Sequence, residues 1–70
     1  MSAPAATTPG QRLEARYGAL IRALEALEDL EADAKAAGDE WGATELRLQI
    51  RNLEKRERGL EGALAALGLR

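Results

Sequence analysis

Ala36-Ala37-Gly38-Asp39-Glu40 is the one break in a helical pattern that otherwise continues from about residue 8 to about residue 67. Gly38 is typical of the glycine that ends a helix, since a residue without Cβ adopts the left-handed conformation without strain. Asp39 is typical of the N-cap that starts the next helix. A connection this short makes consecutive helices run antiparallel. The stretch therefore predicts an all-α chain folded as an antiparallel two-helix hairpin of the coiled-coil type.

The first half of the chain has a clear helix start. Residues 1–7 are small and polar without apolar periodicity, and they predict a disordered N-terminal tail. Thr8, Pro9 and Gln11 then have the spacing of a capping box, with proline at the position where its missing N–H costs nothing. We expect the first helix over about residues 8–37.

The second half begins at the turn itself, which is expected at residues 38–39. The second helix is expected over about residues 39–67. Residues 68–70 are expected to form a C-terminal cap, in which Gly68 adopts the left-handed conformation. Leu69 would then supply the apolar contact that accompanies such an ending.

Apolar residues recur in both halves at alternating steps of three and four, which is the heptad pattern of a coiled-coil seam. The predicted seam consists of Leu13, Tyr17, Leu20, Leu24, Leu27, Ala34, Ala43, Leu46, Ile50, Leu53, Leu60, Leu64 and Leu67. Folding the chain at Gly38 brings together residues whose numbers sum to 77, so that Leu24 faces Leu53. Ala34 faces Ala43 beside the turn, and these small side chains let the helices converge there.

Two glutamates, Glu31 and Glu57, interrupt the seam. We expect their carboxylates to tilt toward solvent, as long side chains at the edge of a seam commonly do. Opposite-charge pairs are expected beside the seam, Glu28 near Arg47 and Lys35 near Glu40. Such exposed pairs contribute little energy but help to select the register.

Composition argues against several kinds of chemistry. The 70 residues include no cysteine and no histidine, which excludes disulfides, thiolate zinc sites and imidazole catalysis. A seam between two helices encloses no pocket in which paired carboxylates would acquire perturbed pKa values. We therefore expect no enzyme activity, no catalytic residue, no metal site and no cofactor.

Charge and hydropathy bear on location and partners. The net charge is −2, too close to balance to favour nucleic acid or an acidic membrane as a partner. No signal peptide and no membrane span is predicted, so a cytoplasmic location is expected. Arginine outnumbers lysine eight to two, which suggests a GC-rich bacterial or phage genome. Two helices bury only a seam, and a chain of this size usually needs a partner.

Three surface patterns are candidates for binding. The oligomer interface is predicted at a stripe of small residues beside the seam, namely Ala19, Ala23, Ala26 and Leu30. Such a stripe permits close helix approach, although alanine is also simply the best helix former on a surface. Trp41 and Leu48 fall on the outward face of the second helix and form a candidate partner-binding patch. The alternative is that Trp41 folds over the turn and covers Ala37 and Gly38.

The third pattern is a basic stripe in the second helix, formed by Arg47, Arg51, Lys55 and Arg58. Its helical spacing would let it follow a phosphate backbone. Interleaved acids and the lack of aromatic residues favour a solvated mixed-charge face instead, as does the local spacing of Glu54 and Arg58.

The tip, from Ala34 through Gly38-Asp39 to Glu45, resembles the acidic coiled-coil tip of bacterial Gre transcript-cleavage factors. The second acid of that tip falls at Gly42 here, so the resemblance does not imply cleavage activity. In shape, the expected hairpin is similar to Rop-type hairpins, which dimerise into four-helix bundles.

The favoured interpretation is a non-enzymatic hairpin that acts through protein–protein interaction. It would pair with itself, most simply as a homodimer forming a four-helix bundle, and serve as an adaptor, inhibitor or assembly component for an unidentified protein. One alternative is a coiled-coil arm or subunit of a larger machine, such as an RNA polymerase-binding factor or a phage assembly. The other is a Rop-like RNA- or DNA-binding helical dimer that uses the basic stripe.

Overall fold

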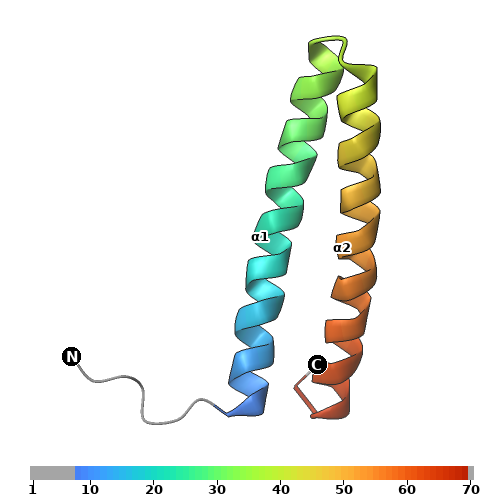
Figure 1. Ribbon diagram of the computed structural model, residues 1–70. Coiled ribbons are helices and arrows are strands. Elements are labelled where there is room, and N and C mark those ends of the chain that lie inside the picture. The colour runs from blue at the N-terminus through green and yellow to red at the C-terminus, as the bar shows by residue number, and fades with distance from the viewer. Residues whose placement is uncertain (1–7, 70) are drawn as a thin grey trace, which may run out of the picture.

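Two long α-helices joined by a tight turn make up the computed structural model, which describes residues 8–69 (Figure 1). Helix α1 spans Pro9–Ala36 and helix α2 spans Glu40–Ala66. The helices pack against each other along their length as an antiparallel hairpin, which confirms the predicted fold. The tail predicted at residues 1–7 lies outside the described residues.

The N-terminus of α1 carries the predicted capping box. The Thr8 hydroxyl oxygen accepts a hydrogen bond from the backbone N–H of Gln11 at 3.1 Å. In return, the backbone N–H of Thr8 donates to the Gln11 side-chain oxygen at 2.9 Å. These two bonds satisfy N–H groups that have no partner inside a helix, and Pro9 at the first helical position has no N–H that would need one.

At the turn, Asp39 takes part in both the end of α1 and the start of α2, directly after the left-handed Gly38. Gly38 has a φ of 76°, and its N–H donates to the Lys35 carbonyl at 3.1 Å. The N–H of Asp39 donates to the Ala34 carbonyl at 2.8 Å, which completes a Schellman motif. The Asp39 carboxylate in turn accepts from the Gly42 N–H at 2.9 Å and caps α2.

The open end of the hairpin closes with the same motif. Gly68 has a φ of 77° and donates to the Ala65 carbonyl at 3.0 Å, while the N–H of Leu69 donates to the Leu64 carbonyl at 2.9 Å. The Leu69 side chain then crosses to α1 and lies over Gly10. A Cβ at Gly10 would stand 2.6 Å from the Leu69 Cδ1, so glycine leaves room for this contact.

The core is one row of side chains between the helices. Only Leu24, Ala43, Ile50 and Leu64 are buried apolar residues among those described. The other predicted seam residues of α1 and α2 are half-buried, namely Leu13, Tyr17, Leu20, Leu27, Ala34, Leu46, Leu53 and Leu60. Leu67 does not belong to the seam as predicted, because it follows the last turn of α2 as its C-cap and is 52% exposed.

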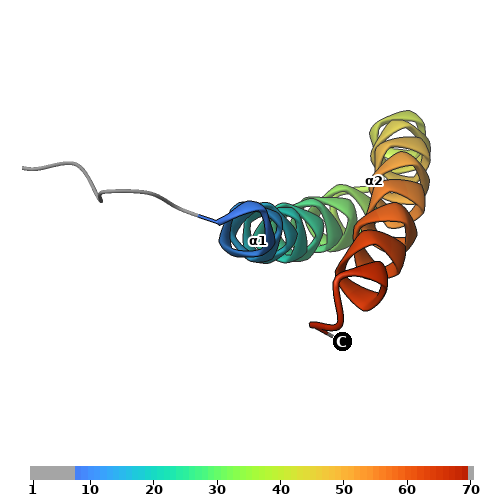
Figure 2. The same ribbon diagram turned by 90° about the horizontal axis from the view of Figure 1, so that it is seen from below.

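The contacts between the helices agree with the predicted register. Arg47 bonds to Glu31 and Tyr17 bonds to Glu61, and each of these pairs sums to 78, one more than directly facing residues. The helices lie closest at the turn and separate toward the open end in Figure 1, and Figure 2 shows that they cross at an angle. This divergence follows from the small residues near the turn and the leucines farther away.

Candidate interaction surfaces

An ion pair between a buried glutamate and a half-exposed arginine joins the two helices near the turn. Glu31 is only 6% exposed, and its two carboxylate oxygens accept hydrogen bonds from Nε and Nη2 of Arg47, each at 2.9 Å. The Lys35 ammonium lies 3.6 Å from the same carboxylate. This bidentate geometry is the strongest that a carboxylate and an arginine can form. Glu31 therefore ties α1 to α2 at one fixed register.

Three predictions about this region are wrong. Glu31 does not tilt toward solvent, because Arg47 reaches across the narrow part of the hairpin and replaces the water that the carboxylate would lose. For the same reason Arg47 pairs with Glu31 and not with Glu28. Lys35 approaches Glu31, one turn earlier on its own helix, and not Glu40.

The positions beside the seam differ sharply between the two broad faces of the hairpin. On one side, six of seven flanking residues are charged: Glu14, Ile21, Glu28, Lys35, Arg47, Glu54 and Glu61. We call this side the charged face. On the other side only two of seven are charged: Arg16, Ala23, Leu30, Gly42, Gln49, Arg56 and Ala63. We call this second side the small-residue face. One position farther from the seam, it carries the small residues Ala19, Ala26 and Gly59 and the charged residues Arg12, Asp33 and Glu45.

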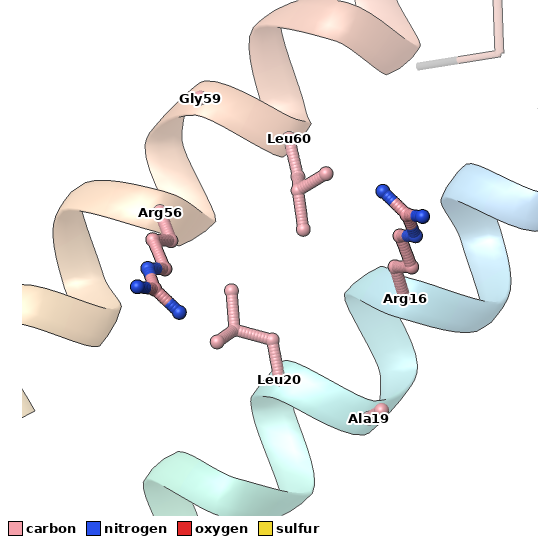
Figure 3. Close-up of a pocket in the computed structure, with 6 residues that line it drawn as sticks. All are labelled: Arg16, Ala19, Leu20, Arg56, Gly59 and Leu60. Atoms are coloured by element: carbon pink, nitrogen blue, oxygen red, sulfur yellow. The ribbon is translucent and has the colours of Figure 1, made fainter.

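An open groove of about 560 Å³ lies on the small-residue face toward the open end of the hairpin. Its lining consists of Arg16, Ala19 and Leu20 from α1 and Arg56, Gly59 and Leu60 from α2. Figure 3 shows Leu20 and Leu60 pointing toward one another between the helices, with the two arginines on either side of them. Because Ala19 and Gly59 have almost no side chain, the apolar floor stays open to solvent.

The predicted oligomer stripe lies on this face. Ala19, Ala23 and Ala26 are exposed, and Leu30 is 52% exposed. Only Ala19 of these four also lines the groove. The periodicity gave no sign of Arg16, Arg56 and Gly59 as groove residues, since they occupy flanking or outer positions and the groove exists only because the helices diverge.

Trp41 and Leu48 lie on the outer edge of α2, with 77% and 50% of their surfaces exposed. Trp41 does not cover the turn. Ala37 and Gly38 are themselves exposed, and a Cβ placed on Gly38 would meet no atom within 4 Å. The alternative in which the indole packs over the turn therefore does not describe this hairpin.

The basic stripe on α2 is divided. The guanidinium of Arg47 is engaged by Glu31, whereas Arg51, Lys55 and Arg58 are exposed. The Nε–Nη2 edge of the Arg47 guanidinium is directed at the Glu31 carboxylate, whereas Arg51, Lys55 and Arg58 form no ion pair within residues 8–69. Fewer cations mean fewer phosphate contacts and a weaker electrostatic attraction to nucleic acid.

Comparison with known proteins gives no relative: no family model, no curated protein and no solved structure matches this chain. Among residues 8–69, no three acidic side chains gather in a way that could hold a metal ion. Neither helix of this range is long and apolar enough to cross a membrane.

Proposed function

We propose that the protein is a non-enzymatic, self-associating helical hairpin that acts through protein–protein contacts. Two copies stack through their small-residue faces and form a four-helix bundle. The observation that carries this proposal is the contrast between the two faces, because only the small-residue face has few charged residues directly beside the seam, where contact would desolvate them.

The thin core supports a partner on energetic grounds. Residues 8–69 bury four apolar side chains in a single row, which is few for two helices that must be ordered. Apolar burial and conformational entropy nearly cancel in a chain this small. Stacking a second hairpin on the small-residue face would turn the row into a core with side chains from four helices, as in antiparallel bundles.

The composition of the small-residue face suits such a stack. Alanine and glycine at Ala19, Ala23, Ala26 and Gly59 allow helices to approach closely, and Leu30 adds a large apolar side chain to the same face. The charged face, by contrast, would bring many carboxylates together if two copies met through it. Self-association is therefore assigned to one face only.

A pair of matched substitutions tests the proposal. Ala26 lies on the small-residue face, whereas Ala32 lies on the charged face, one position farther from the seam than Glu28 and Lys35. Both are exposed alanines in α1. Ala26→Glu places a charge inside the contact, so the variant should sediment as a monomer under conditions where the unmodified chain is a dimer. Ala32→Glu should leave the sedimentation unchanged. A dimer that survives Ala26→Glu, or an unmodified chain that sediments as a monomer at high concentration, would refute the assignment.

Stacking through the small-residue face leaves Trp41 and Leu48 on the outer edge of the bundle. A dimer of this kind presents two copies of the same exposed aromatic and leucine patch. Aromatic side chains are enriched where binding energy is concentrated, so this patch is the surface through which the dimer would bind another protein. Two identical patches on one body would also raise the apparent affinity for a repeated target.

A further inference from the structure

The groove and its two arginines point to the orientation of the second copy. Among the described residues neither Arg16 nor Arg56 forms an ion pair, and both flank an open apolar floor. The exposed acids of the small-residue face, Asp33 and Glu45, lie at its other end, beside the turn. The face is thus basic toward the open end and acidic toward the tip.

This distribution is complementary to itself when one copy is reversed. If the two-fold axis crosses the face between Ala23 and Ala26, α1 of one copy lies antiparallel on α1 of the other. Residues at equal height then have numbers that sum to 49, so Ala23 meets Ala26. The axis lies two residues, or about 3 Å, from the middle of α1, and the copies overlap over nearly their whole length.

The same arithmetic places a side chain over the groove. Ala19, on the groove wall, stands level with Leu30 of the second copy. Gly59, on the opposite wall of the groove, faces residue 18 within its own hairpin. It therefore lies at nearly the same height as Ala19 and as Leu30 of the second copy. Leu30 is a flanking residue, so its side chain projects beside the furrow between the helices rather than at the outer edge. It is 52% exposed in the isolated hairpin.

The charges fall into register with this contact. Arg16 stands level with Asp33 of the second copy. Glu45 faces residue 32 in its own hairpin, which puts it beside Asp33 and within reach of both groove arginines of the second copy. The reverse orientation, with both tips at the same end, would bring Arg16 and Arg56 of the two copies together and their acids together, which is repulsive.

We infer that the groove is the docking site for Leu30 of a second, antiparallel copy. Arg16 and Arg56 hold that copy by pairing with Asp33 and Glu45, the acids beside its Leu30. The inference rests on the proposed self-association and adds its orientation. Each dimer contains two such contacts related by the two-fold axis. Leu30→Ala removes a buried leucine from both contacts and should therefore weaken association at least tenfold. Leu48→Ala removes an equally exposed leucine from the outer edge of α2 and should leave the affinity unchanged.

Single cysteines test the orientation directly, because the natural chain has none. A chain carrying Leu30→Cys is mixed with one carrying Gly59→Cys, where a new Cβ meets no atom within 4 Å, and disulfides are allowed to equilibrate. Each chain holds one thiol, so every disulfide joins two copies. The mixed disulfide should dominate, and the second chain keeps its own Leu30 to hold the dimer together. The control mixture pairs Leu30→Cys with Gln49→Cys, which lie at similar height only when both tips point the same way.

Charge reversal tests the orientation of the dimer independently, through the direction in which the dissociation constant changes. In the antiparallel dimer, Arg16→Glu and Asp33→Arg should each raise the dissociation constant several-fold, and the double variant should recover the original value. With the tips together, Arg16→Glu would relieve repulsion and tighten the dimer.

The outcomes separate the two proposals. A sedimenting dimer that forms the Leu30→Cys to Gln49→Cys disulfide, or neither disulfide, would overturn the antiparallel docking and leave self-association standing. An unmodified chain that remains a monomer would overturn both.

Discussion

Glu31 occupies a seam position where a leucine would continue the heptad, and Arg47 keeps it there with two short hydrogen bonds. A carboxylate removed from water is stable only when charged donors replace the lost hydration. The two partners differ in exposure, since the side chain of Glu31 is 8% exposed and that of Arg47 is 47% exposed. Losing the arginine therefore leaves a buried charge without its main partner, whereas losing the glutamate leaves an arginine that water can still solvate.

This asymmetry predicts unequal effects of removing each partner. Arg47→Ala leaves a carboxylate inside the seam with only Lys35 nearby, and should lower the free energy of unfolding by about 1–3 kcal/mol. Glu31→Leu continues the seam and lets Arg47 turn to water, so stability should be unchanged or higher. Chemical denaturation measures both, with exposed Arg51→Ala as the control. Equal losses in the two variants would contradict the asymmetry.

The helices themselves follow closely from local sequence. Thr8, Gly38 and Asp39 have chemistry that suits few positions other than helix ends, and the heptad spacing is long enough to set the register. The Glu31–Arg47 pair could not be predicted in the same way, because heptad spacing marks a glutamate as an interruption without saying which cation reaches it. The groove escaped prediction because it depends on the angle between the helices, which no single helix encodes.

Two glycines allow the same substitution to be compared in opposite contexts. Gly38 has a positive φ at the end of α1, whereas Gly62 is an exposed residue inside α2 with open space around it. Gly38→Ala should lower the free energy of unfolding by about 1 kcal/mol, because alanine is strained in the left-handed conformation. Gly62→Ala should raise it by up to about 1 kcal/mol through helix propensity. Thermal unfolding of the two variants gives the signs, and a stabilising Gly38→Ala would place the turn elsewhere.

At the scale of the whole molecule, the hairpin has two broad faces and an outer edge with separate properties. We place self-association on the small-residue face and not on the charged face, and the outer edge of α2 carries Trp41. Assigning different contacts to different surfaces would let the proposed dimer form while the candidate partner-binding patch at Trp41 and Leu48 stays free.

Trp41 is the only tryptophan, so its fluorescence reports on the outer edge alone. Acrylamide quenching of Trp41 should be the same in dilute and concentrated protein, since the proposed association does not cover a side chain that is 77% exposed. As a control, Leu30→Trp in a Trp41→Ser background should become less accessible to quencher as the protein associates. If Trp41 itself is shielded at high concentration, the interface includes the outer edge and the two surfaces are assigned the wrong way round.

The double role of Asp39 has a consequence for attack by proteases. Its N–H closes α1 and its carboxylate opens α2, so the tip contains no stretch of chain that is free of helix-end hydrogen bonds. A protease grips its substrate as an extended segment of several residues, and the tip offers none until a helix end has unwound. The rate of cleavage at the tip would therefore follow the rate at which the helix ends unwind. A cleavage product cut there would show that the hairpin had opened locally, because the folded tip contains no flexible loop.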